Sequence, residues 1–222
     1  MIIDFIGMPG CGKSFCAKQL ENHLLNHGIR VHNMSRDKES TLIYKLIFRV
    51  SEKIVKVLPS YKKKANIIKC QVADYVKDQP LYFKNDFCQI LHNVLTHLFV
   101  HNVFQKGTAV FINDEGILHK LLYLHVHYNI PIACIIDMYN SLGCNPVNIV
   151  INNDVDLSYR YIKSRNRHDC AMDELKDNVL LEYLDSFYNG IHTTTLPNTI
   201  CIDRTTPISQ NVEILYKIIF EK

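Results

Sequence analysis

The feature that most constrains this 222-residue chain is a glycine-rich segment near its beginning. The segment reads Gly7-Met8-Pro9-Gly10-Cys11-Gly12-Lys13-Ser14. It matches the pattern Gly-x-x-x-x-Gly-Lys-Ser/Thr, and it lies between a short apolar run and a stretch with helical periodicity. The glycines let backbone N–H groups point at phosphate oxygens, and the following helix adds the positive end of its dipole. We therefore predict a nucleoside-triphosphate site, against the alternative of a chance glycine-rich turn.

Two side chains of this segment have expected roles of their own. Lys13 supplies a positive charge to the β- and γ-phosphates, and the Ser14 hydroxyl is the expected ligand of a magnesium ion. Phe15 follows directly and is included among the expected nucleotide contacts. The cofactors that this segment indicates are ATP and Mg²⁺.

Short apolar runs and helical patterns alternate along the chain. We expect strands at residues 2–6, 29–34, 109–113, 147–152 and 199–203. We expect helices directly after the glycine-rich segment, throughout about 39–106, and at 117–128, 156–164, 173–188 and 208–220. The run 130–138 fits a helix or a strand, and we favour a helix. Strands separated by helices form parallel crossovers, so we predict a three-layer α/β fold whose parallel sheet has about five strands.

Composition narrows the class of protein. Length and a hydrophobic content of 47% fit one domain over residues 1–222. No apolar stretch approaches the roughly 20 residues of a membrane-spanning helix, and a net charge of +3 does not indicate nucleic-acid binding. The eight cysteines form no Cys-x-x-Cys pair, and nothing before Gly7 resembles a signal peptide. We expect free, buried thiols in the reducing cytoplasm.

Two acids follow the expected third strand. Ligands bind at the carboxyl ends of parallel strands, which places Asp114 and Glu115 at the same edge of the sheet as the glycine-rich segment. We assign magnesium binding or general-base work to this pair, with Asp114 as the expected metal ligand, and which acid is the base stays open. The alternative is that Asp114 caps the helix beginning near Ile117 and that Glu115 is solvated.

Three arginines gather near the expected helix 156–164. The guanidinium group matches the oxygens of a transferring phosphoryl group and keeps its charge. We predict a lid over about residues 160–172, with Arg165 and Arg167 as catalytic residues and Arg160 in support. An arginine-rich surface helix is the competing interpretation.

Taken together, these elements make the chain resemble the P-loop nucleoside and nucleotide kinases, nearest in layout to thymidylate kinases. The resemblance rests on the glycine-rich loop, the long helical segment, the acidic motif, the Arg-Tyr-Ile-Lys-Ser-Arg-Asn-Arg stretch and the late Ile-Cys-Ile-Asp-Arg-Thr-Thr-Pro strand and turn. It implies that residues 39–106 bind the phosphate acceptor and that Thr205, Thr206 and Pro207 lie near the base of the donor.

The chain also departs from thymidylate kinases at two motifs. It has Ser35-Arg36-Asp37 where they carry Arg-Glu-Pro, and Asp114-Glu115-Gly116 where they carry an Asp-Arg pair. We therefore expect another acceptor, with Arg36, Asp37 and Arg49 as candidates to bind it.

Two functions are consistent with these residues. The first is an ATP- and magnesium-dependent phosphotransferase that acts on a small molecule such as a nucleoside or a nucleotide. The second is a P-loop NTPase or nucleotide-dependent switch that acts on a protein partner. A guanine-reading Asn-Lys-x-Asp motif is absent from the sequence, and the arginine-rich stretch and long helical segment favour the first. The oligomeric state stays open, with a homodimer as one alternative.

Overall fold

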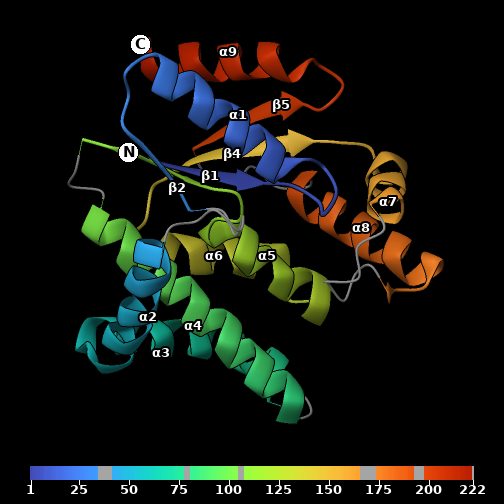
Figure 1. Cartoon of the computed structure of the whole chain (residues 1–222). Helices are drawn as coiled ribbons and strands as arrows, with labels where there is room; N and C mark the ends of the chain where they lie inside the picture. Colours follow the sequence, from blue (N-terminus) through green and yellow to red (C-terminus); the bar gives the residue numbers. More distant parts are fainter. Residues whose placement is uncertain (35–41, 78–80, 105–107, 166–173, 193–197, 222) are drawn as a thin grey trace.

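A computed structural model describes residues 1–34, 42–77, 81–104, 108–165, 174–192 and 198–221 (Figure 1). Its sheet has five parallel strands in the order β2-β3-β1-β4-β5. The strands are β1 Ile2–Ile6, β2 Val31–Asn33, β3 Val110–Asn113, β4 Val147–Asn152 and β5 Thr199–Asp203. All five lie at the places that the sequence predicted, so the expected parallel α/β sheet is confirmed.

Apolar side chains of β1 pack on both faces of the sheet. Ile3 and Phe5 pack in the cluster that includes α1 (Lys13–Asn26) and α9 (Ile208–Phe220). Ile6 packs on the opposite face, in a cluster with residues of α5 (Ile117–Tyr128), α6 (Ile132–Leu142) and α8 (Asp177–His192). Figure 1 shows α1 and α9 on one side of the sheet and α5 and α6 on the other. The expected three layers are therefore present.

The described part of the segment between β2 and β3 is helical, as predicted, and residues 39–41, 78–80, 105 and 106 of the expected stretch lie outside the described residues. It contains α2 (Leu42–Val57), α3 (Pro59–Val76) and α4 (Leu81–Phe104), which contact one another (Figure 1). Leu91, Leu95 and Leu98 of α4 are buried. They recur at helical spacing, and the resulting apolar face joins this segment to the core beside α5.

The ambiguous run 130–138 lies mostly in a helix, α6, which begins after Pro131. Its residues Ile135, Met138, Tyr139 and Leu142 are buried at spacings of three and four, which is the pattern of one helix face. The helix ends at Gly143, whose φ of 65° is a left-handed conformation that glycine adopts without strain.

Two other expectations need correction. The helix expected at 173–188 runs from Asp177 to His192, and its buried residues continue to Ile191, which accounts for the later end; residue 173 lies outside the described residues. Free thiols are buried at Cys11 and Cys16, but three other cysteines are exposed: Cys70, Cys88 and Cys201. The first two of these are on helices α3 and α4, and Cys201 is on the edge strand β5, so one side of each element faces solvent. No helix in the described residues has both the length and the apolar character needed to cross a membrane.

Candidate functional site

The glycine-rich loop joins β1 to α1 at the carboxyl edge of the sheet. Gly10 and Gly12 have φ values of 81° and 93°, in the left-handed region that side chains disfavour. A Cβ on Gly10 would lie 2.7 Å from the carbonyl oxygen of Ser158, so the loop also packs closely against α7 (Val155–Ser164). The backbone conformation therefore favours glycine at both positions, and the packing against α7 also requires it at Gly10.

Lys13 begins α1, and its ammonium group is turned back onto the loop. Nζ donates to the carbonyl oxygens of Gly7 at 2.8 Å and Met8 at 3.0 Å, and the side chain is buried. The ammonium therefore lies against the curved backbone that the sequence predicted to bind phosphate.

Ser14 and Asp114 meet across the edge of the sheet. The Ser14 hydroxyl donates to Asp114 Oδ2 at 2.7 Å, which joins the first turn of α1 to the segment after β3. Burial raises the pKa of the Asp114 carboxyl, and the hydrogen bond from Ser14 acts in the opposite direction. The two side chains expected to hold a metal ion are thus brought together.

Asp114 does not cap the helix that follows it, so the alternative interpretation of this residue is wrong. The N-cap of α5 is Gly116, which has no side-chain hydrogen bond to offer. Instead, the backbone N–H of Ile117 donates to Oδ2 of Asp4, on β1, at 3.2 Å. Asp114 is therefore left to pair with Ser14.

Glu115 lies beside two buried basic side chains that the sequence analysis missed. His119 Nε2 is 4.0 Å from Glu115 Oε1, and Lys120 Nζ donates to the Glu115 carbonyl oxygen at 2.6 Å. Burial lowers the pKa of His119 well below its usual value, and the charges of Lys13 and Lys120 lower it further. His119 is therefore neutral near pH 7. The available signal for His119 was its spacing in the sequence. It follows Glu115 by four residues, and side chains at this spacing lie close together where the backbone is helical.

The arginine-rich stretch lies partly within the described residues. Arg160 is exposed on α7, and Arg165 ends that helix. Arg167 lies outside the described residues. Asp154 caps α7 by accepting from the N–H groups of Asp156 and Leu157, which fixes where the helix begins beside the loop.

A further arginine, Arg204, was missed although it directly precedes Thr205. Its Nε would lie 3.1 Å from a Cβ on Gly12, and its guanidinium carbon is 5.8 Å from the ring centre of Tyr161 on α7. Arg204 therefore lies between the phosphate-binding loop and the helix expected to lead into the lid. The signal was its place in the turn after the last strand, at the same edge of the sheet.

The turn after β5 is held by its own hydrogen bonds. The backbone N–H and the hydroxyl of Thr205 donate to Asp203 Oδ1 at 2.8 and 2.7 Å, and these bonds lower the pKa of Asp203. Thr206 N–H donates to the Asp203 carbonyl, and Pro207 is the N-cap of α9. The three residues expected near the nucleobase of the donor thus lie in one hydrogen-bonded turn that starts at Arg204.

Of the three residues expected to bind the phosphate acceptor, only one lies within the described residues. Arg36 and Asp37 lie outside the described residues, and Arg49 is exposed on α2. The two histidines spaced four residues apart on α4 have different partners: His97 packs edge-on against Phe48, whereas His101 lies 3.0 Å from Asn113. Within the described ranges, no three His, Cys, Asp or Glu side chains are grouped as a metal site.

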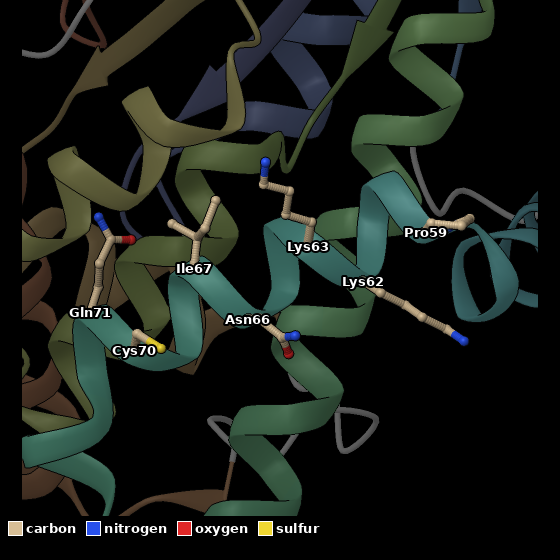
Figure 2. A pocket seen from close by; sticks show the side chains of 7 residues that line it. All are labelled: Pro59, Lys62, Lys63, Asn66, Ile67, Cys70 and Gln71. Atoms are coloured by element: carbon tan, nitrogen blue, oxygen red, sulfur yellow. The ribbon is translucent and has the colours of Figure 1, made fainter.

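A shallow hollow of about 650 Å³ lies elsewhere, on α3. Figure 2 shows that its labelled side chains all come from this one helix, and that Lys62 and Lys63 extend away from each other. Neither acids nor residues of the glycine-rich loop line it. We therefore place the candidate site at the edge of the sheet.

Comparison with known proteins identifies the fold. Neither protein-family models nor curated proteins match this sequence. A solved structure of deoxyadenosine kinase from M. mycoides, with the products dCMP and a flexible dCDP bound, matches over 100% of both chains with a TM-score of 0.53 and 15% identity. The structure of the same kinase with dCTP bound matches over 100% of both chains with a TM-score of 0.51 and 15% identity. The structure with dATP bound matches over 98% of both chains with a TM-score of 0.50 and 15% identity. The expected P-loop nucleoside kinase fold is confirmed; at this identity the similarity establishes the fold alone.

Proposed function

We propose that this chain is an ATP- and magnesium-dependent phosphotransferase that moves the γ-phosphate to a small acceptor, a nucleoside, a nucleotide or a similar metabolite. The observation that carries the proposal is the 2.7 Å hydrogen bond between Ser14 and Asp114 at the phosphate-binding loop. It brings together a hydroxyl and a carboxylate that are 100 residues apart in the sequence. The similarity to deoxyadenosine kinase structures supports a nucleoside or nucleotide as the acceptor.

The oxygen atoms of Ser14 and Asp114 fit Mg²⁺, which binds proteins through one or two carboxylates together with phosphate oxygens and water. These two residues would hold the ion. When bound, magnesium supplies charge neutralisation at the β- and γ-phosphates. A nearby cation favours the charged form of Asp114 and so offsets the effect of burial on its pKa.

Lys13 would bind the donor phosphates. Its ammonium now donates to the carbonyl oxygens of Gly7 and Met8, and phosphate oxygens would replace these as partners. At the nucleobase of the donor, the guanidinium plane of Arg204 can stack against the flat ring of the base, with Thr205, Thr206 and Pro207 beside it. Arg160, Arg165 and Arg167 would close over the phosphates, where a guanidinium group stabilises the charge of the transition state.

When the small-molecule acceptor attacks through a hydroxyl, as a nucleoside does, the reaction needs a general base. The hydroxyl oxygen attacks the γ-phosphorus, its proton passes to the carboxylate of Glu115 or Asp114, and ADP leaves with the electrons of the broken P–O bond. Glu115 suits this role because its side chain is 31% exposed and lies beside neutral His119, whereas Asp114 is engaged with Ser14. We assign the base to Glu115 and the metal to Asp114.

The acceptor would bind against the helical segment 39–106, with Arg36, Asp37 and Arg49 as its ligands. We further propose that the chain acts as one domain in the cytoplasm, on a small molecule, without nucleic acid or membrane, as a monomer or a homodimer. The free cysteines in the described residues fit a reducing compartment.

A coupled ADP-release assay tests the proposal. The protein is incubated with ATP, Mg²⁺ and a panel of nucleosides, nucleotides and sugars, beside a Lys13→Ala control. We expect release that depends on one class of acceptor and that the control abolishes. Acceptor-independent hydrolysis would instead support an NTPase or switch acting on a protein partner.

A further inference from the structure

Asp4 is a buried acid near the middle of the sheet. It lies on the central strand β1 with no exposed surface, on the face opposite to Ile3 and Phe5. A carboxylate is rarely fully buried unless hydrogen bonds satisfy its oxygens. The partners of Asp4 therefore indicate why an acid stands at this position.

Two of those partners flank the acidic segment at the candidate site. Asn113, the last residue of β3, donates from Nδ2 to Asp4 Oδ1 at 2.6 Å. Ile117, the first residue of α5, donates its backbone N–H to Asp4 Oδ2 at 3.2 Å. One carboxylate thus holds the residues immediately before Asp114 and immediately after Gly116, which fixes both ends of the three-residue segment between them.

Gly116 shows how closely this segment is held. A Cβ at this position would lie 2.2 Å from Cγ of Asp4, a distance that forces something to move. Its φ of −72° and ψ of −174° are open to any residue, so backbone conformation does not require glycine here. Glycine is required at this position by the close approach of the Asp4 carboxylate.

The same cluster includes a residue of the helical segment. His101, near the end of α4, has Nε2 3.0 Å from Asn113 Nδ2 and 3.7 Å from Asp4 Oδ1. Burial lowers the pKa of His101. If Nε2 accepts from the Asn113 amide, the proton of the neutral ring is on Nδ1. The cluster therefore joins β1, β3, α4 and the start of α5.

We propose that Asp4 is a positioning residue: by holding Asn113 and Ile117 it fixes the segment Asp114–Gly116, and so places Asp114 against Ser14 and Glu115 toward the acceptor. This inference rests on the proposed function. Asp4 acts through its two hydrogen-bond partners, which lie in the sequence directly next to the working segment. Residues that orient a metal ligand in this way typically change metal affinity or activity about 10- to 100-fold when they are replaced.

Two substitutions separate hydrogen bonding from packing. Asp4→Leu keeps the approximate shape of the side chain and removes both acceptor oxygens. Asp4→Asn keeps one oxygen for the Ile117 N–H, and its amide group can donate to Asn113 once the Asn113 amide turns over. Tyr139→Phe is the matched control, because it removes the buried 3.2 Å hydrogen bond from Asn148 on the neighbouring strand β4 without touching the acidic segment.

Two properties are measured for each folded variant: kcat with saturating acceptor, and the affinity for a fluorescent ATP analogue with and without Mg²⁺. For Asp4→Leu we expect kcat to fall at least about tenfold and the effect of Mg²⁺ on affinity to shrink, as for loss of an orienting partner. Asp4→Asn should retain both properties within about threefold, and Tyr139→Phe should retain both even if its melting temperature falls.

The inference is overturned if folded Asp4→Leu keeps wild-type kcat and magnesium dependence, or if Asp4→Asn is impaired as severely as Asp4→Leu. Should Asp4→Leu fail to fold, Gly116→Ala carries the same expectation, because its methyl group would displace the segment from Asp4. A wild-type protein that binds the ATP analogue with magnesium but transfers no phosphate would contradict the proposed function. The magnesium dependence of the variants would still decide the role of Asp4.

Discussion

Ser14 Oγ lies 2.7 Å from Oδ2 of Asp114, so the first turn of α1 and the segment after β3 share one hydrogen bond at the carboxyl edge of the sheet. The order of the strands places β3 directly beside β1, which makes this contact between distant parts of the sequence possible. The fold therefore places one candidate metal ligand, Asp114, beside the other, Ser14, which belongs to the phosphate-binding loop itself.

Replacing the two acids separately distinguishes their roles. Asp114→Asn should lower kcat about 100-fold or more, comparable to removing one electrostatic group from an active site, and should raise the Mg²⁺ concentration needed for half-maximal rate. Glu115→Gln should lower kcat with little change in magnesium dependence, because it removes the base and leaves the metal ligands. Magnesium titrations of the initial rate measure both effects. The assignment is reversed if Glu115→Gln is the variant that shifts the titration.

The glycines of the loop should be needed for nucleotide binding. Gly10→Ala adds a Cβ 2.7 Å from the Ser158 carbonyl oxygen at a φ of 81°, and Gly12→Ala adds one 3.1 Å from Arg204 Nε at a φ of 93°. We expect each to weaken ATP binding at least about tenfold, which calorimetry would measure; tenfold corresponds to about 1.4 kcal/mol.

Gly28→Ala is the control for backbone strain. Its φ is 73°, and nothing lies within 4 Å of the added Cβ. The free energy of unfolding should fall by about 1–2 kcal/mol from the left-handed conformation alone, with ATP affinity unchanged. Equal loss of affinity in the loop variants and in this control would show that general instability is the cause.

Arg204 should contribute to binding of the donor. Arg204→Ala removes the guanidinium group between Gly12 and Tyr161, and we expect the dissociation constant for ATP to rise about tenfold, the effect of about 1.4 kcal/mol. Arg204→Lys should recover little of the lost ATP affinity, since an ammonium group does not stack as a flat guanidinium does. Arg30→Ala, at an exposed arginine before β2, is the control for loss of one positive charge. An unchanged affinity in Arg204→Ala would remove this residue from the donor site.

Stability should fall in mild acid. The pKa of buried His119 lies well below the value of about 6.5 that it has when unfolded, so protons bind the unfolded chain first as the pH falls. The contribution of neutral His119 is therefore complete above about pH 6.5 and decreases from there toward its folded pKa. His119→Gln should flatten the dependence of the melting temperature on pH between 7.5 and 5.5. Ile135→Val, a buried non-titrating change on α6, should lower the melting temperature equally at both values.

The fold followed from the sequence because its signals were local. Each strand was a short apolar run, and helices α2, α3 and α4 showed regular spacing such as that of Leu91 and Leu95. The start of α8 was misplaced because periodicity marks a buried face better than it marks an end.

The site was recovered where a motif defined it and missed where packing did. Lys13, Ser14 and Asp114 were expected from the loop and from the end of a strand, and the structure brings them to one edge. Arg204 was missed although its place in the turn after the last strand was visible in the sequence. Asp4 was missed because its importance depends on a contact with Ile117, which is distant in the sequence. Local spacing carries no information about such contacts.

The proposed activity is the transfer of a phosphoryl group from ATP to a small acceptor. The most direct test uses ATP labelled at the γ-phosphate, with Mg²⁺ and a panel of deoxynucleosides and nucleoside monophosphates, and follows the label. We expect the label to appear on one class of acceptor, removal of magnesium to stop the transfer, and Lys13→Ala to abolish it. Label found only in free phosphate, at a rate independent of every acceptor, would show that the chain hydrolyses ATP and is not a small-molecule kinase.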